Sequence, residues 1–168
     1  HYLGDKVLRQ KAKRIAKVDD EIRTLAKEML QTMYSSQGIG LAAPQVGVNK
    51  RLIVIDTDPE NPANAPLVLI NPEIKKFGQQ LCPFEEGCLS IPGVHLDVIR
   101  PDEIEVSYRD EQGKPKRIKA SGLLSRVIQH EIDHLDGVMF VDRVENEIAL
   151  SSQLKQRGFA LKSVQRIA

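Results

Sequence analysis

His130-Glu131-Ile132-Asp133-His134 is the stretch of sequence around which the rest of this chain is organised. In a helix, His130 and His134 lie on the same face, one above the other, because they are four residues apart. Two imidazoles in that arrangement can bind one metal ion, and Glu131 can reach a water on that ion. The same helix has an apolar side, formed by Ile128, Ile132 and Leu135. The stretch therefore predicts a partly buried metal-binding helix that carries its own general base.

The composition is that of a globular chain of 168 residues, 41% apolar and 28% charged. This length predicts a single domain over residues 1–168 with a substantial hydrophobic core. The net charge of +1 argues against a nucleic-acid interface, and no apolar run is long enough to predict a membrane span. The two cysteines, Cys82 and Cys88, are too few for a disulfide framework, so at least one is expected to be a free thiol or a metal ligand.

Apolar spacing and turn residues predict an α+β fold, with mixed or antiparallel sheets packed around the metal-binding helix. An N-terminal helix is expected from Asp19 or Asp20 to Gly38, and a C-terminal helix from about Glu145. The apolar side of that last helix is expected to contain Ile148, Leu150, Leu154 and Leu161. Strands are expected at 51–56, 67–71, 73–81 and 95–100, followed by a hairpin of 103–109 and 114–120. The basic residues 1–17 are interpreted as a solvated segment lying over the domain.

Residues 38–45, Gly-Ile-Gly-Leu-Ala-Ala-Pro-Gln, form a second unusual stretch. A phosphate-binding loop is excluded, because a helix precedes the stretch and the Lys-Ser/Thr ending is missing. Two interpretations remain: a simple loop, or an extended segment whose glycines allow another backbone to come close. Gln45 is the one polar side chain in this apolar run, so it is expected to point at a partner.

A catalytic metal site needs a third protein ligand in addition to the two histidines. The metzincin pattern is excluded, because Phe140 stands where that pattern requires a third His. Cys88 is the favoured third ligand, since a thiolate is a strong soft donor and Gly87 beside it allows the backbone to turn. The competing candidates are two carboxylates placed as in thermolysin-like sites and two other donors: Glu145, Glu147, Cys82 and His95.

Three stretches together resemble the peptide deformylase family: 38–45, 86–90 (Glu-Gly-Cys-Leu-Ser) and 130–134. Their order and spacing match the family, and the resemblance runs from about Val7 to Val144. It implies that the chain removes the N-formyl group from the starting methionine of new polypeptides and releases formate. The opening residues 2–5 depart from the proline-bearing start that is common in this family.

The resemblance also implies a complete site. Cys88, His130 and His134 would hold one divalent ion, Fe²⁺ in this family, which Zn²⁺, Ni²⁺ or Co²⁺ can replace. Hydroxide on the metal would attack the formyl carbon, with Glu131 as general acid/base. Gln45 and the Leu89 N–H would stabilise the oxyanion. The substrate would lie as a strand in a cleft lined by Ile39, Gly40, Leu41, Glu86, Gly87, Leu123, Arg126 and Val127.

The partners implied by the resemblance are N-formyl-methionine nascent peptides and, through the basic C-terminal helix, the ribosome. The implied location is the cytoplasm of a bacterium, or an organelle matrix or stroma for a processed eukaryotic form. Two other functions use the same ligands. A zinc metallopeptidase would cut internal peptide bonds, and a structural metal module would recruit Cys82 as a fourth ligand.

Overall fold

The computed structural model describes residues 1–167 and confirms the α+β fold. The helices are α1 (Asp20–Ser35), α2 (Gly122–Leu135) and α3 (Glu147–Gln156), with short 3₁₀ turns η1 (Lys6–Arg9), η2 (Ala43–Val46), η3 (Phe140–Arg143) and η4 (Leu161–Ser163). The strands are β1 (Gly40–Ala42), β2 (Leu52–Ile55), β3 (Leu67–Phe77), β4 (Leu81–Cys88), β5 (Ile91–Pro101), β6 (Ile104–Arg109) and β7 (Pro115–Ala120). No helix within residues 1–167 is both long and apolar enough to cross a membrane.

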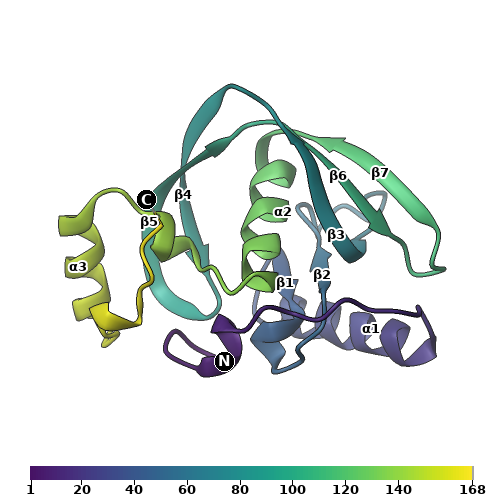
Figure 1. Cartoon of the computed structure of the whole chain (residues 1–168), viewed down its shortest axis with the longest axis horizontal. Coiled ribbons are helices and arrows are strands. Elements are labelled where there is room, and N and C mark those ends of the chain that lie inside the picture. Colours follow the sequence, from purple (N-terminus) through teal and green to yellow (C-terminus); the bar gives the residue numbers. More distant parts are fainter. Residues whose placement is uncertain (168) are drawn as a thin grey trace.

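Five strands form an antiparallel sheet in the order β1-β2-β3-β6-β7, and β4 and β5 form a separate antiparallel hairpin. A parallel pairing is described at one isolated bridge, between Lys13 and Lys50. Figure 1 shows α2 in the middle of the molecule, between the five-stranded sheet and the β4–β5 hairpin. The predicted central helix is therefore confirmed, and the hairpin and the sheet approach it from different sides.

The two faces of the sheet are buried by different helices. Successive side chains of a strand point to opposite faces, so Ile53 and Ile55 of β2 pack in one cluster, whereas Leu52 and Val54 pack in another. The first cluster contains the apolar side of α2, namely Val127, Ile128, Ile132 and Leu135. The second contains the apolar side of α1, namely Ile22, Ala26, Met29 and Met33. Thus α2 packs against one face of the sheet, and α1 covers the other face.

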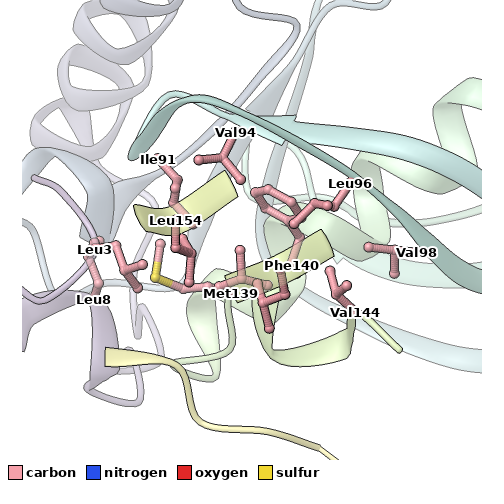
Figure 2. Close-up of a cluster of buried hydrophobic side chains, with 12 residues drawn as sticks. Leu3, Leu8, Ile91, Val94, Leu96, Val98, Met139, Phe140, Val144 and Leu154 are labelled. Atoms are coloured by element: carbon pink, nitrogen blue, oxygen red, sulfur yellow. The ribbon is translucent and has the colours of Figure 1, made fainter. Parts of the chain in front are cut away.

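A third buried cluster joins the hairpin to the C-terminal part of the chain (Figure 2). Every buried side chain of β5 in this cluster is apolar, and Phe140 and Met139 from the start of η3 pack against them. The cluster consists of Leu3, Leu8, Ile91, Val94, Leu96, Val98, Met139, Phe140, Val141, Val144, Leu150 and Leu154. It holds the hairpin in place from the side of the C-terminal segment.

One strand prediction is wrong: residues 67–77 form one strand, β3, and do not end at Asn71. Asn71 takes a left-handed backbone conformation with φ of 52°, and the pairing with β6 shifts register between Ile70 and Glu73. This bulge absorbs Pro72 without ending the strand. The Asn71 side chain bonds both the N–H and the carbonyl of Ile15, at 2.8 Å each, so the N-terminal segment fixes the bulge.

The helix ends also differ from the prediction. α1 ends at Ser35, and the left-handed residue after it is Gln37 (φ 57°) instead of Gly38. α3 starts at Glu147 and ends at Gln156, because Gly158 takes a φ of 78° and turns the chain. Ile148 is 85% exposed and Leu161 lies in η4, so neither belongs to a buried side of α3.

The N-terminal segment is more firmly attached than a solvated cover would be. Leu3, Leu8, Ala12 and Ile15 are buried, and the Arg9 guanidinium forms an ion pair with the buried Asp142. Arg9 also donates to the Gly137 carbonyl just after α2, at 2.9 Å. The segment lies over the domain with its lysines exposed, as interpreted, and the buried apolar residues and Arg9 attach it.

Candidate metal centre and cleft

The structure brings together three side chains that can hold a metal ion: Cys88, His130 and His134. One donor atom from each lies within 4.8 Å of the other two, and Cys88 Sγ is 3.3 Å from His134 Nε2. The two histidines come from adjacent turns of α2, whereas Cys88 ends β4. The cluster therefore forms where the hairpin meets the central helix.

Hydrogen bonds and buried charges surround the three candidate ligands. The Ser90 N–H donates to Cys88 Sγ at 3.4 Å, and Gln45 Nε2 lies 3.6 Å from the same sulfur. Burial and the charge of His130 hold the pKa of His134 well below its usual value, which leaves a neutral ligand. Burial opposes a charge on His130, but Glu131 and hydrogen bonds to neighbouring groups raise its pKa well above its usual value. The two imidazoles therefore differ: the neutral form is favoured at His134 and the protonated form at His130.

Glu86 orients the first histidine. Its Oε1 is 2.9 Å from His130 Nδ1, so Nε2 of that ring is the nitrogen left for a metal. Arg100 donates to both carboxylate oxygens, at 2.7 and 3.0 Å, and Arg126 donates to Oε2 at 2.8 Å. Burial opposes the ionisation of Glu86, but the hydrogen bonds from His130 and Arg100 hold its pKa well below its usual range. Asp133 extends the network by accepting from Arg100 at 2.8 Å.

Glu131 lies beside the metal cluster and is 4% exposed. Its Oε1 is buried with no hydrogen-bond partner among the described residues. Burial raises the pKa of Glu131 to about 7, so both of its protonation states are accessible near neutral pH. A Cβ on Gly40 would lie 2.5 Å from Glu131 Oε2, so β1 passes directly over this carboxylate. The glycine thus accommodates a side chain of α2.

Gln45 is the polar residue that was expected to point at a partner, and its amide is held at both ends. Oε1 accepts from the Ala42 N–H at 3.0 Å, and Nε2 donates to Ser90 Oγ at 3.0 Å. Proline at the start of η2 helps to turn the chain here, so that Gln45 faces back toward the segment that follows β4. Its N–H₂ group therefore lies next to Cys88 and the Leu89–Ser90 turn.

A cavity of about 610 Å³ lies beside the metal cluster. All of the predicted substrate-binding residues except Leu41 line this cavity. The Leu41 side chain is buried in the cluster that contains the apolar side of α1. The lining residues that the prediction named are Ile39, Gly40, Glu86, Gly87, Leu123, Arg126 and Val127. Val127 lines the cavity and also packs in the sheet cluster, so it belongs both to the cleft wall and to the core.

The competing ligands lie outside the metal cluster. Glu145 and Glu147 are exposed, and Glu147 lies 3.6 Å from the Arg166 guanidinium. Cys82 Sγ lies 3.5 Å from the Pro83 carbonyl oxygen, and among the described residues it is not in the group that can hold a metal. His95 lines the outer part of the cavity with its ring against Gly87. Phe140, at the position of the missing third His, stacks on His130 with 5.9 Å between ring centroids.

Sequence reasoning missed four residues of the site: Phe84, Ser90, Arg100 and Asp133. Phe84 lines the cavity, and the other three make the hydrogen bonds described above. Two of them had a detectable signal. Asp133 lies inside the histidine motif, and Arg100 falls on the buried side of an alternating strand, where an unpaired charge would be costly.

The comparisons with known proteins agree with this geometry. A family model described as polypeptide deformylase matches residues 1–149. The chain is 62% identical to "Peptide deformylase 1" of Nostoc sp. over 168 residues, which is all of this chain and 90% of that protein. It is 63% identical to a peptide deformylase of Thermosynechococcus vestitus, again over all of this chain and 89% of the relative.

Solved structures show the same relationship. The crystal structure of a peptide deformylase from Synechococcus elongatus, in complex with actinonin, matches with a TM-score of 0.98 and 60% identity, over 99% of this chain and 91% of that one. A plant peptide deformylase matches with a TM-score of 0.87 and 42% identity, over 93% and 84% of the two chains. On this evidence the chain belongs to the peptide deformylase family, the metalloenzymes that remove N-formyl groups from nascent peptides.

Proposed function

We propose that this chain hydrolyses the formyl group of N-formyl-methionine at the start of new polypeptides, with Cys88, His130 and His134 as metal ligands. The observation that carries the proposal is the position of Glu131, a buried carboxylate with a free oxygen, beside three converging donors at one cavity. Two donors on one helix and a third on a hairpin leave one side of the cluster facing that cavity. This is the arrangement of a catalytic site, which keeps an open position, and not of a structural one.

The donor set fits the metal that the family implies. One thiolate and two imidazoles suit Fe²⁺, and also Zn²⁺, Ni²⁺ or Co²⁺, better than they suit Mg²⁺ or Ca²⁺, which prefer oxygen ligands. The Ser90 N–H donates to Cys88 Sγ at 3.4 Å, and the Glu86 carboxylate orients His130. When bound, the metal would supply an activated water at neutral pH and would polarise the formyl carbonyl.

Glu131 would move the proton. Its carboxylate takes a proton from the attacking water and passes it to the leaving amine. A pKa raised to about 7 by burial keeps the two protonation states close in free energy near neutral pH, so both transfers are accessible. Gly40 closes the space above the carboxylate, which limits the positions that the Glu131 side chain can occupy.

Gln45 and the Leu89 N–H would stabilise the negative oxygen of the tetrahedral intermediate. The Gln45 amide is oriented in advance by its bonds to the Ala42 N–H and Ser90 Oγ, which leaves the N–H on the side of Cys88 Sγ to face the oxyanion. Removing one such donor typically costs about 3–4 kcal/mol of transition-state stabilisation.

The substrate would bind as an added strand. β1 is an edge strand that pairs with β2 along one side, so its other side can accept an extended peptide. An apolar wall for the methionine side chain is formed by Phe84, Leu123 and Val127, which line the same cavity. We expect the space beside the metal cluster to admit a formyl group and to exclude an acyl group that carries a side chain.

The further partner and location are proposed from the family resemblance. Lys155 in the last turn of α3 and Arg157 directly after it are exposed cations that support a contact with ribosomal RNA. If a Lys155→Glu variant binds purified ribosomes with the same affinity as the wild-type protein, this contact is contradicted. Relatives from cyanobacteria support a bacterial cytoplasmic location.

The decisive experiment compares formyl-Met-Ala with acetyl-Met-Ala as substrates of the metal-loaded protein. Release of formate without release of acetate is expected; a zinc metallopeptidase would instead cut longer peptides internally. Glu131→Gln should keep the metal and lose about 10²–10⁴-fold in turnover. Glu21→Gln, on the exposed first turn of α1, serves as the matched control. A Glu131→Gln variant with full turnover would refute the assigned role.

A further inference from the structure

Arg126 is 7% exposed and attaches α2 to both strands of the β4–β5 hairpin. Its Nη1 donates to Glu86 Oε2 at 2.8 Å and to the Val98 carbonyl of β5 at 2.9 Å. Its Nη2 donates to the Cys82 carbonyl of β4 at 2.6 Å. The guanidinium also lies over the Phe84 ring, with 5.5 Å from Cζ to the ring centroid. One side chain therefore contacts the backbone, a carboxylate and an aromatic ring of the hairpin.

This attachment lies where the metal cluster is assembled from two separate elements. Arg126 precedes His130 by one turn of α2, and the hairpin that it holds ends in Cys88. The spacing between the thiolate and the imidazoles is thus set by how the hairpin packs against the helix. Glu86 provides a second connection, because it accepts from Arg126 and also contacts His130 Nδ1 at 2.9 Å.

Charge neutralisation alone does not explain Arg126. Arg100 already makes two bonds to Glu86 and one to Asp133, so the Glu86 carboxylate has a cationic partner without Arg126. What Arg126 adds is the pair of bonds to main-chain carbonyls and the contact with Phe84. A planar guanidinium can make these contacts at the same time, whereas the single ammonium of a lysine cannot.

The contact with Phe84 extends the same attachment to the substrate cleft. Phe84 is a half-exposed ring that lines the cavity together with Leu123, and one of its faces is covered by the Arg126 guanidinium. Without the guanidinium this face of the ring would lose its support. The cleft wall at Phe84 and the strand that ends in Cys88 therefore share their contact with one side chain of α2.

We propose that Arg126 is a positioning residue that couples the cleft wall to the metal cluster, fixing the packing of Cys88 against His130 and the position of Phe84. The proposal rests on the function proposed above for this site. In this role Arg126 contributes to metal binding and to substrate specificity, but it touches neither the metal nor the reacting atoms.

The test compares Arg126→Ala and Arg126→Lys with Arg117→Ala. Arg117 is the matched control, because it donates to Glu105 at 2.8 Å on the far side of the sheet with a side chain that is 55% exposed. Two quantities are measured: the Kd for Zn²⁺, by competition with a chromophoric chelator, and the ratio of kcat/KM for formyl-Met and formyl-Ala peptides. The first quantity requires no turnover.

Arg126→Ala is expected to weaken Zn²⁺ binding by about 10–100-fold, as is typical when the support of a metal ligand is removed. It should also lower the preference for formyl-Met by about tenfold, the lower end of what a well-fitted apolar pocket provides. Arg126→Lys should fall between wild type and Arg126→Ala in both quantities, and Arg117→Ala should match wild type.

A wild-type value of either quantity in Arg126→Ala would overturn the coupling. If circular dichroism shows that Arg126→Ala does not fold, Arg126→Lys decides by the same criterion. The Zn²⁺ affinities test the positioning role independently of the reaction. A wild-type protein that binds Zn²⁺ but cleaves neither formyl peptide would refute the proposed function instead.

Discussion

Gly40→Ala is the change that most directly tests the placement of Glu131. Gly40 begins β1 and does not have a positive φ, so alanine can adopt its backbone conformation without strain. The conflict is purely steric: the new Cβ would lie 2.5 Å from Glu131 Oε2 and 2.7 Å from Val127 Cγ1. Both neighbours belong to α2, whose packing against the sheet is fixed by the buried cluster beneath it.

The magnitude follows from these distances. An ordinary contact begins at about 3.4 Å, so the Glu131 carboxylate or β1 must move by about 1 Å. Overpacking of this size destabilises a protein by about 1–3 kcal/mol. A displacement of about 1 Å at a reacting group can lower the rate about 10²-fold. The metal ligands are not displaced by the new methyl group, so metal content should stay at the wild-type level.

The assay measures formate release, bound metal and the urea midpoint for Gly40→Ala, wild type and a matched Gly78→Ala control. Gly78 follows β3, and a Cβ there would lie 3.2 Å from Glu103, away from the cleft. The control should lose a little stability and no activity per folded molecule. A Gly40→Ala enzyme with full metal content and wild-type kcat would refute both the steric argument and the position of the general base.

Three other predictions concern the ligands and the scaffold. Cys88→Ser should lose metal and activity together, whereas Cys82→Ser should keep both; metal analysis of the two proteins decides which thiol is the ligand. The iron form should lose activity in air, while the zinc form should keep it. Mass spectrometry of the inactivated iron form should detect added oxygen on Cys88 in preference to Cys82. Iron enzyme that stays active in air with unmodified Cys88 would contradict this prediction. Asp142→Asn should lower the free energy of unfolding by about 3 kcal/mol, because the buried Asp142 accepts from Arg9, from the Met139 N–H and from the Gln165 N–H; a urea midpoint within error of wild type would argue against it.

Local sequence patterns predicted the helices and strands well where one periodicity of apolar residues extended over a whole segment. The apolar spacing of α1 and α2 and the alternation of the β6–β7 hairpin gave elements close to those observed, because each depends on residues a few positions apart. The prediction failed where a single residue overrode the local rule. At Asn71 a bulge carried the strand past a proline, and in the N-terminal segment no local pattern indicated the contacts of Arg9 with distant residues.

The sequence by itself determined the two imidazoles and the carboxylate of one helical motif, because the 3.6-residue period fixes which side chains of a helix share a face. Three separate motifs also indicated the family, and with it Cys88 and Gln45 as expected members of the site. The tertiary structure alone decided that Cys88 Sγ lies 3.3 Å from His134, that Gly40 passes over Glu131, and that Arg126 joins the helix to the hairpin. These contacts join residues more than 25 positions apart in the chain. No local period relates such residues, so their meeting depends on how the buried clusters pack the hairpin and the sheet against α2.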